Sequence, residues 1–535
     1  MTVEPIKGIL HTKDYAHFQI VSPEGEDILS TFEGGALAKG CLWGDTVEWT
    51  GTHCKFIERG EHELIVGTLE LASRTTYGLT SRGNSIYLFI PYDRRYPPFI
   101  TGSSERDRSV HRVGLITLES WDIKSQFPRG TLVRLLGPSG DLRTEEEALR
   151  WLACPRQSLR ANDIPAPAPI RALEADAKRV RITGYTFNID PPDCRDIDDV
   201  ISMEQITIDN WRITITIADV ATYVEEMSAV DTLAAIHGQT LYCDGEAICP
   251  MLPPSISERV CSLVAGEERL GVSLQFQWNR ISGTISDIEW LESQLVNDRS
   301  FTYDEFERWD DTMRTVLQLV TSSIASETIT DSHKWIEVLM KFYNIQSALR
   351  LQAIRVGILR KHSAPQMDRI QKYSAWDESL SRLAQSSAEY CLADATQTTH
   401  YGIGCEAYCH ATSPIRRYAD LMNQRLLKQL VRGINDGLLV TVSVHDLNRS
   451  AKVARDYEKN LFYLRALLVG PRKISGRILD IEETKMRIWI PSWQKTVNLR
   501  IDKEYDLKEG QIVNLQCALN LLGRHWQERL VVQIE

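Results

Sequence analysis

The stretch RVRITGYTFNIDPPDCRDIDDVIS, residues 179–202, joins a strand-like run to a dense group of acidic side chains. Five aspartates fall within ten residues after Ile189: Asp190, Asp193, Asp196, Asp198 and Asp199. Carboxylates this close repel one another unless one takes a proton or a cation neutralises them. An all-oxygen ligand set favours Mg²⁺ or Mn²⁺ over zinc. The spacing therefore predicts a divalent metal site where a strand ends.

Two plainer interpretations of this acidic loop remain open, a solvated surface loop and a calcium loop. A helix-loop-helix calcium site needs glycine at its sixth position and glutamate at its twelfth. Counted from Asp190, neither residue type appears there. Pro191 and Pro192 stiffen the turn after Asp190, which favours carboxylates that are held in place.

Around this stretch, residues 174–468 have the pattern of a mixed α/β domain. The run WRITITIADV, residues 211–220, alternates like a strand, and long helical patterns follow it. Within residues 335–360, apolar residues recur at helical spacing and predict a helix face turned to a core. These residues are Trp335, Leu339, Phe342, Leu349 and Ala353.

Short strand-like runs separated by turn residues fill the chain before this domain and after it. They predict two small β-barrels, residues 1–70 and 71–165, and a third barrel at residues 470–535. The proline-rich run NDIPAPAPIRA, residues 162–172, cannot continue a helix or strand and predicts a linker.

The composition is that of a globular protein of several domains. The chain has 535 residues and a net charge of −11, so a nucleic-acid partner would need a locally basic channel. No run approaches the roughly 20 apolar residues of a membrane span, and the start lacks the apolar core of a signal peptide. We expect a cytoplasmic protein without a membrane partner. The eleven cysteines include no CxxC pair, which argues against a zinc ribbon or a disulfide framework.

A second motif, HATSPIRRYADLMNQRLL, spans residues 410–427. Thr412 or Ser413 is a natural N-cap, and Pro414 fits the first position of a helix. Arg416 and Arg417 would then lie in the first turn, where the helix dipole disfavours cations. An anion would explain them, because helix amides and a guanidinium together bind phosphate. A salt bridge to a neighbouring acid is the alternative.

The two motifs together indicate metal-assisted phosphoryl chemistry. Carboxylates would hold the metal that activates water, and arginine would take the growing charge of the phosphate. Flanking barrels would bind a nucleic-acid strand, which suggests a nuclease acting on single strands. An enzyme for small phosphate esters would also fit the two motifs, but it would leave the barrels unexplained.

The same strings resemble the signatures of the RNase II, or RNB, family of exoribonucleases. IDPPDCRDIDDVIS resembles the first signature and HATSPIRRYADLMNQRLL the second. Residues 241–273 look like the family's stretch after the metal motif. ILRKHSAP and the preceding IEVLMKFYN are most similar to eukaryotic, exosome-type members. The resemblance covers residues 187–427 and implies two cold-shock domains, an RNB domain and an S1 domain of the OB type, without a nuclease domain ahead of the first barrel.

The resemblance also implies roles for individual residues. Asp190, Asp196, Asp198 and Asp199 match the four catalytic aspartates that hold magnesium, whereas Asp193 falls where the family varies. Arg416 matches the arginine that contacts the scissile phosphate. Tyr242 falls near an aromatic residue that stacks on bases, with core packing as the alternative. His410, Ser413 and Arg417 are expected to line the substrate path or to support Arg416.

Some residues depart from the family pattern. A segment with a GAL-like core is missing between Arg314 and Trp335, so the second half of a base clamp is not supplied. Thr216, Thr222 and Gln424 stand where histidines are common, and Cys409 and Ala411 flank His410 in place of the usual residues. None of these changes removes a metal ligand, so we expect the chemistry to be retained.

Three further candidates are weaker. Cys405, Cys409 and His410 could bind zinc but lack a second cysteine pair. Asp219 is more typical of a structural acid than of a catalytic one. Lys361 and His362 would either line an RNA path or form a solvated turn.

The resemblance implies a hydrolytic 3′-to-5′ exoribonuclease that uses Mg²⁺, or Mn²⁺, to degrade single-stranded RNA to nucleoside 5′-monophosphates. A catalytically weak or inactive RNA-binding protein on the same scaffold is the alternative. A monomeric catalytic unit is expected, with an exosome-like or other RNA-decay complex as a partner.

Overall fold

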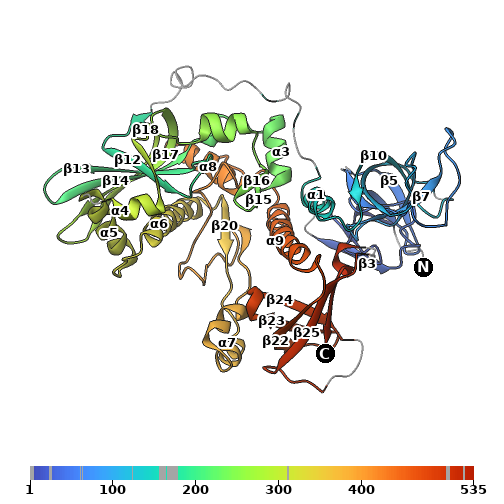
Figure 1. Cartoon of the computed structure of the whole chain (residues 1–535). Helices are drawn as coiled ribbons and strands as arrows, with labels where there is room; N and C mark the ends of the chain where they lie inside the picture. Colours follow the sequence, from blue (N-terminus) through green and yellow to red (C-terminus); the bar gives the residue numbers. More distant parts are fainter. Residues whose placement is uncertain are drawn as a thin grey trace. The chain divides into compact units, whose positions relative to one another are not determined.

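The computed structural model describes residues 5–22, 27–60, 62, 64–122, 124–155, 159, 164, 179–309, 312–501, 506–521 and 525–535. The chain forms two compact units, which are coloured along the sequence in Figure 1. Unit 1 comprises Met1–Gln157 with Arg455–Glu535, and unit 2 comprises Ser158–Ala454. Apart from Ile164, the expected linker at residues 162–172 lies outside the described residues.

Unit 1 begins with a five-stranded antiparallel sheet of order β3-β2-β1-β4-β5. Its strands are β1 (Ile6–Thr12), β2 (His17–Val21), β3 (Ile28–Glu33), β4 (Thr46–Trp49) and β5 (Cys54–Glu58). Three stacked rings form the centre of its core, with centroids 4.9 Å apart for Phe18 and Phe32 and 4.3 Å apart for Phe32 and Trp49. Phe18 on β2, Phe32 on β3 and Trp49 on β4 are buried positions of these strands.

The next five strands close into a barrel of order β10-β8-β7-β6-β9. They are β6 (Ile65–Leu69), β7 (Ile86–Pro91), β8 (Phe99–Gly102), β9 (Arg112–Ser120) and β10 (Arg129–Pro138). Helix α1 (Leu142–Ala153) follows, capped by Asp141, which accepts from the Thr144 amide. The expected boundary at residue 70 assigns β6 to the first barrel, whereas the structure pairs β6 with β7 and β9 of the second.

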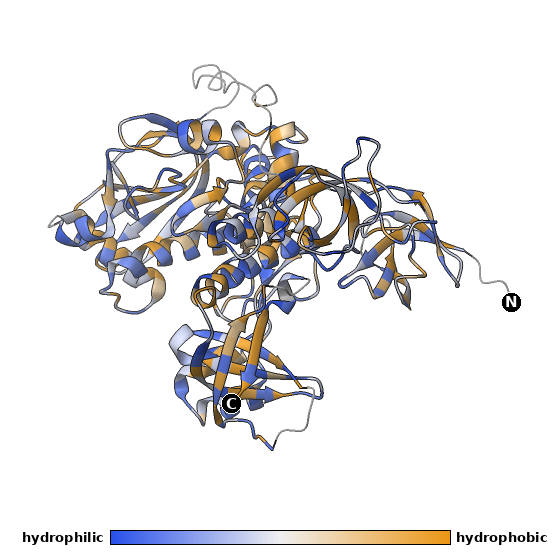
Figure 2. Cartoon of the chain, turned by 45° about the vertical axis from the view of Figure 1, so that its right-hand side comes forward, coloured by the Kyte–Doolittle hydropathy of each residue, from blue (hydrophilic) through white to orange (hydrophobic). Residues whose placement is uncertain are grey.

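The third sheet of unit 1 is antiparallel, of order β24-β23-β22-β25-β26. It contains β22 (Arg472–Ile481), β23 (Lys485–Ile490), β24 (Lys495–Arg500), β25 (Ile512–Leu519) and β26 (Leu530–Ile534). Apolar residues are frequent along these strands (orange in Figure 2) and form a separate core.

A buried ion pair links this third part of unit 1 to α1 and the closed barrel. Arg529 Nη1 lies 2.8 Å from Glu145 Oε2, and the two side chains are 1% and 0% exposed. Tyr92 of the barrel region donates to the same carboxylate at 2.9 Å, and the Arg529 guanidinium lies over the Tyr92 ring. Burial of both charges makes each dependent on the other.

Unit 2 is built on a seven-stranded sheet of order β11-β18-β17-β14-β13-β12-β19. Its strands are β11 (Val180–Arg181), β12 (Tyr185–Asp190), β13 (Asp199–Gln205), β14 (Asn210–Ala218), β17 (Glu268–Asn279), β18 (Ile285–Val296) and β19 (Arg299–Thr302). Neighbours are antiparallel except β11 with β18 and β12 with β19. The run expected as one strand at residues 179–189 is divided into β11 and β12, and the run 211–220 forms β14 up to Ala218.

The sheet separates two cores. Successive residues of a strand point to opposite faces, so Val200 joins one core and Ile201 the other. Helices α4 (Tyr303–Arg308), α5 (Thr312–Ala325) and α6 (Ser332–Ala353) contribute to the core of Ile201, and α3 (Ala229–His237) to that of Val200. Helix α8 (Tyr418–Val431) contributes to both.

The buried face of α6 differs from the expected one. Trp335 and Leu339 are buried as expected, but Leu349 is 44% exposed and Ala353 is also exposed. The buried stripe continues through Tyr343 and Leu351 instead, and the Tyr343 hydroxyl donates to the Val272 carbonyl at 3.1 Å. Which of two adjacent positions of α6 becomes buried depends on the sheet that the helix covers.

Smaller elements complete the description. Two small two-stranded sheets in the described part of unit 2 pair β15 (Leu241–Cys243) with β16 (Glu246–Cys249), and β20 (Ile358–Lys361) with β21 (Glu389–Leu392). Helix α7 (Met367–Ser374) lies between β20 and β21 in sequence, and α9 (Val444–Leu467) precedes the third sheet. Among the described residues, no helix has the length and apolar character needed to cross a membrane.

Candidate active site

The acidic loop connects two neighbouring antiparallel strands, which brings its two ends together. Asp190 is the last residue of β12 and Asp199 is the first of β13. Asp198 is buried at 4% exposure, and Asp190, Asp196 and Asp199 are partly buried. Asp193 is exposed, with a φ of 63°. Asp193 therefore differs from the other four aspartates in its exposure.

A chain of amides orients Asp190. Asn188 Nδ2 donates to Asp190 Oδ2 at 2.7 Å, and Asn188 Oδ1 accepts from Asn297 Nδ2 at 2.8 Å. Asn297 also donates to the Leu263 carbonyl at 2.8 Å and is 1% exposed. Asn188 of β12, Asn297 between β18 and β19, and Leu263 before β17 therefore act together to fix one carboxylate.

Asp198 connects the acidic loop to the arginine motif. The Ile415 amide donates to Asp198 Oδ1 at 3.0 Å, and Arg416 Nε donates to Oδ2 at 3.3 Å. Arg416 Nη2 also donates to the Ser413 hydroxyl at 3.1 Å. The Arg416 side chain is still 50% exposed. The two sequence motifs therefore meet, with part of the guanidinium open to a ligand.

Asp196 is held by Tyr242. The hydroxyl of Tyr242, on β15, donates to Asp196 Oδ2 at 2.8 Å, and the Cys194 thiol lies 3.8 Å from Oδ1. The tyrosine is partly buried, so it is not simply a core residue. This hydrogen bond places the aromatic ring next to the carboxylates.

Asp190, Asp198 and Asp199 resist ionisation in the folded protein. Burial raises the pKa of Asp198 to about 7, although Arg416 and the Ile415 amide act in the opposite direction. Burial also raises the pKa of Asp190, and burial together with the charges of Asp190 and Asp198 raises that of Asp199 well above its usual value. A nearby positive charge would relieve this penalty.

The donor set fits a hard divalent cation bound through few protein ligands. All the acidic ligands are carboxylate oxygens, which Mg²⁺ and Mn²⁺ prefer. Within the described parts of the chain, no three of these carboxylates bring their oxygens within 4.8 Å of one another. Mg²⁺ commonly binds one or two carboxylates together with substrate phosphates and water. A cation shared with a bound phosphate is therefore compatible with this arrangement.

The arginine motif is not a helix N-terminus, which corrects the expectation from sequence. Helix α8 begins at Tyr418, and Arg417 is its N-cap without a side-chain capping bond. The Ser413 amide donates to Asp420 Oδ1 at 2.8 Å, and the Ile415 amide is taken by Asp198. Because these two amides donate to carboxylates, they are not available to bind a phosphate. Recognition of a phosphate therefore depends on the guanidinium of Arg416.

The other predicted substrate-binding residues support this turn. Arg417 Nη2 lies 2.8 Å from Asp420 Oδ1, as the salt-bridge alternative expected. Ser413 is 3% exposed and accepts from Arg416. His410 Nδ1 lies 3.0 Å from the Tyr390 hydroxyl, and burial, assisted by Arg417, lowers the pKa of His410 well below its usual value. His410 is therefore neutral near pH 7.

Sequence reasoning missed Tyr303. The tyrosine follows Thr302, whose backbone pairs with Asp190 in the β12–β19 register. Its ring stacks on His333 with centroids 4.0 Å apart and planes 12° apart. Burial and the charges of Asp190 and Asp199 raise the pKa of Tyr303. The only local signal was the capping box of Thr302 and Glu305, which marks a helix start rather than a site.

The weaker candidates have structural partners. Asp219 lies 2.7 Å from Lys428 Nζ and 2.8 Å from Arg179 Nη2, which confirms it as a structural acid. Although burial opposes ionisation, these cations lower its pKa to about 2. His362 is 7% exposed and accepts from the Gly402 amide, so it does not belong to a solvated turn.

The residues that stand where histidines are common in the family also form hydrogen bonds. Thr222 accepts from Arg179 at 2.9 Å, Thr216 bonds to the Ser273 hydroxyl at 2.7 Å, and Gln424 binds the Ala218 carbonyl and the Ala221 amide. The segment without the GAL-like core forms α5 and the start of α6.

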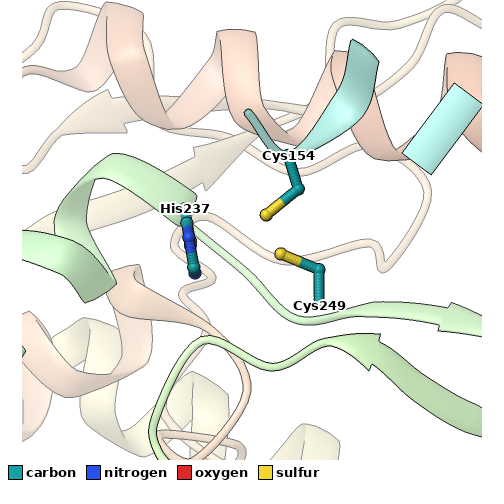
Figure 3. Close-up of side chains that lie close together, drawn as sticks. All are labelled: Cys154, His237 and Cys249. Carbon is teal, nitrogen blue, oxygen red and sulfur yellow. The ribbon is translucent and has the colours of Figure 1, made fainter. Parts of the chain in front are cut away.

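Figure 3 labels three residues with potential metal-ligand side chains, Cys154, His237 and Cys249. His237 ends α3, and its Nδ1 lies 3.2 Å from the Pro250 carbonyl, whereas Cys249 ends β16. Because Cys154 belongs to unit 1 and the other two residues to unit 2, we assign no site to them. The zinc alternative with Cys405, Cys409 and His410 is not formed in the described chain.

Comparison with known families and structures agrees with the two motifs. The RNB domain model matches residues 181–318 and 310–433, and the model of the Dis3-like cold-shock domain 2 (CSD2) matches residues 86–151. The chain therefore contains an RNB domain at residues 181–433. The match includes the acidic loop and the arginine turn.

Individual relatives are distant. "Exosome complex exonuclease RRP44 homolog A" of Arabidopsis thaliana is 23% identical over 515 residues, which cover 77% of this chain and 54% of the relative. The chain spans about half the length of the curated relatives it matches.

Two solved structures share the fold. RNase R of Mycoplasma genitalium, solved with ribose methylated single-stranded RNA, has a TM-score of 0.74 at 17% identity and covers 99% of this chain and 100% of its own. Yeast Ssd1, described as a pseudonuclease, has a TM-score of 0.62 at 15% identity and covers 93% of this chain and 79% of its own. At these identities the similarity shows the fold alone.

Proposed function

We propose that the protein is a metal-dependent 3′-to-5′ exoribonuclease that hydrolyses single-stranded RNA to nucleoside 5′-monophosphates. The contact of Arg416 with Asp198 is the observation that carries this proposal, because it places a phosphate-binding cation against buried carboxylates. RNA as substrate, the polarity and the products come from the family, whose members include named exonucleases.

The roles of the residues follow from their contacts. One or two of Asp190, Asp196, Asp198 and Asp199 would hold Mg²⁺ directly and the others would hold it through water; the bound ion would lower the pKa of water and stabilise the leaving oxygen. The exposed part of Arg416 binds the scissile phosphate and takes its growing charge. Tyr242 orients Asp196 through its hydroxyl and offers its ring to a base.

A second function has one observation in its favour. The fold also resembles that of yeast Ssd1, a pseudonuclease, so an RNA-binding protein without cleavage is a real alternative. The intact set of four aspartates weighs against it. Because relatives are named as exosome complex exonucleases, we also propose an RNA-decay complex as a partner of this chain.

Cleavage of 5′-labelled single-stranded RNA tests the proposal directly. With Mg²⁺ we expect a ladder of products shortened from the 3′ end and release of nucleoside 5′-monophosphates. With EDTA we expect binding without cleavage, because the carboxylates alone activate no water. RNA labelled at the 3′ end should lose its label in the first step. Binding without cleavage in Mg²⁺ and in Mn²⁺ would favour the non-cleaving alternative.

The raised pKa values predict a pH-dependent effect of the metal on stability. In EDTA, Asp198 with a pKa of about 7 holds its proton more tightly than in the unfolded chain, where the value is 3.8. Its contribution to the free energy of unfolding therefore falls as pH rises from 3.8 to about 7. Mg²⁺ binding needs the ionised form, so Mg²⁺ should raise the unfolding temperature more at pH 8 than at pH 6.

Thermal denaturation with and without Mg²⁺ at the two pH values measures this effect. The Asp198→Asn variant is the control, since it cannot ionise at this position and should show a smaller difference between pH 6 and pH 8. An equal effect of Mg²⁺ at both pH values in the unaltered protein would contradict the prediction.

A further inference from the structure

Two buried asparagines bind opposite sides of one peptide group, the one between His410 and Ala411. Asn344 Oδ1 on α6 accepts from the Ala411 amide at 2.8 Å, and Asn423 Nδ2 on α8 donates to the His410 carbonyl at 2.9 Å. Asn344 is 3% exposed and Asn423 is 0% exposed. Each hydrogen bond is therefore formed away from water, where an unpaired partner would be costly.

The remaining polar atoms of both side chains bind nearby. Asn344 Nδ2 donates to the Tyr408 hydroxyl at 3.1 Å and lies 3.4 Å from Thr412 Oγ1. Asn423 accepts from the Ile358 amide at 2.9 Å and donates to the Ile358 carbonyl at 2.8 Å. Fully satisfied buried networks select one arrangement of the groups they join. Residues 408–412 are thus held between α6, α8 and β20.

The held segment leads directly to the arginine that faces the carboxylates. Ser413 follows it, with its amide on Asp420 and its hydroxyl accepting from Arg416 Nη2. Arg416 Nε then lies 3.3 Å from Asp198. A shift of the peptide between His410 and Ala411 would therefore move Ser413 and, with it, the guanidinium. Neither asparagine is among the residues that contact the carboxylates.

We propose that Asn344 and Asn423 are positioning residues that set the place of Arg416 relative to the phosphate. This inference rests on the proposed function, because it assigns Arg416 to an RNA phosphate. The asparagines act through the main chain of residues 410–413 and touch no substrate. Misplacement by about 1 Å lowers the rate of a positioned reaction by about 10²-fold, so the effect should be large.

A double-mutant cycle between Asn344→Leu and Arg416→Ala tests the proposal in the full chain. With Arg416 present, Asn344→Leu should lower kcat, and weaken RNA affinity in EDTA, by about 3- to 100-fold, the range of coupling within one hydrogen-bond network. With Arg416→Ala, the same change should have little further effect. The same cycle is measured with Asn423→Ser and with Asn344→Ser. These variants test the proposal if the leucine variant does not fold.

The control is Ser347→Ala on the same helix. Ser347 is also fully buried, but its hydroxyl donates to the Tyr343 carbonyl of α6 itself. This variant loses a buried hydrogen bond without touching residues 408–412 and should leave kcat and affinity unchanged in both backgrounds.

Equal losses with and without Arg416 would overturn the proposal, because the asparagines would then serve only general stability. An unaltered protein that binds RNA without cleaving it would refute the proposed function, and the affinity cycle in EDTA would still decide on the asparagines. If Arg416→Ala changes neither affinity nor cleavage, the positioning role is wrong as well.

Discussion

The Asp198→Asn variant should bind RNA and cleave it at least about 10²- to 10³-fold more slowly than the unaltered protein, an effect of the size seen when one transition-state contact is lost. Asparagine keeps the shape of the side chain but removes its charge. Asp198 accepts from two donors, the Ile415 amide and Arg416 Nε, through different oxygens. In either orientation of the asparagine, one donor would face its amide nitrogen.

The variant should remain folded, which makes the loss specific. Burial disfavours the charge of Asp198, so its removal relieves a cost in the native state. Single-turnover cleavage in Mg²⁺ and RNA affinity in EDTA measure the two properties separately. Asp193→Asn is the matched control, because Asp193 is an exposed aspartate of the same loop and should be replaceable without effect. Cleavage by Asp198→Asn at the normal rate would remove Asp198 from the mechanism.

Arg416→Ala should lower kcat by about 10²- to 10³-fold, because the guanidinium is the cation placed to take the charge of the phosphate. The loss should exceed the change in affinity, since many other contacts bind the RNA chain. Arg416→Lys should restore only part of the rate. An ammonium group provides charge but cannot donate to Asp198, the Ser413 hydroxyl and a phosphate in one planar arrangement.

Arg212→Ala is the control for this prediction. Arg212 is a partly exposed arginine of the same unit that pairs with Glu204 at 2.6 Å. The pair is worth at most about 1 kcal/mol, so the variant should cleave normally. Saturation kinetics on a single RNA separate kcat from KM for all three variants. A fall in affinity alone, with kcat unchanged in Arg416→Ala, would show that the arginine binds RNA without assisting its cleavage.

Local patterns in the sequence were sufficient to predict the strands and the acidic loop. Alternation marks β14 because apolar residues recur at every second position from Trp211 to Ile217, and the aspartates could be placed because they follow a strand directly. Both signals lie within about twenty residues of one another. The RNB family could be identified for the same reason, since each signature is a continuous string.

Features that depend on distant residues could not be predicted. The start of α8 moved to Tyr418 because Asp198, more than 200 residues earlier, takes an amide of the expected first turn. The buried face of α6 depended on the sheet beneath it, so Leu349 was assigned wrongly. Tyr303 carried no local signal of a site, because its place beside the carboxylates comes from the pairing of β19 with β12. The predicted roles in substrate binding remain predictions.

The ion pair of Arg529 with Glu145 has a consequence for synthesis of the protein on the ribosome. The two residues are separated by 384 positions, so the closed barrel and α1 emerge long before their cation is translated. The other donors to the Glu145 carboxylate in the described part of the chain are neutral: the hydroxyls of Tyr92 and Ser139 and the Gly140 amide. The nascent chain therefore carries this carboxylate without its cation until Arg529 has been translated, so the buried pair can form only after nearly the whole chain has been made.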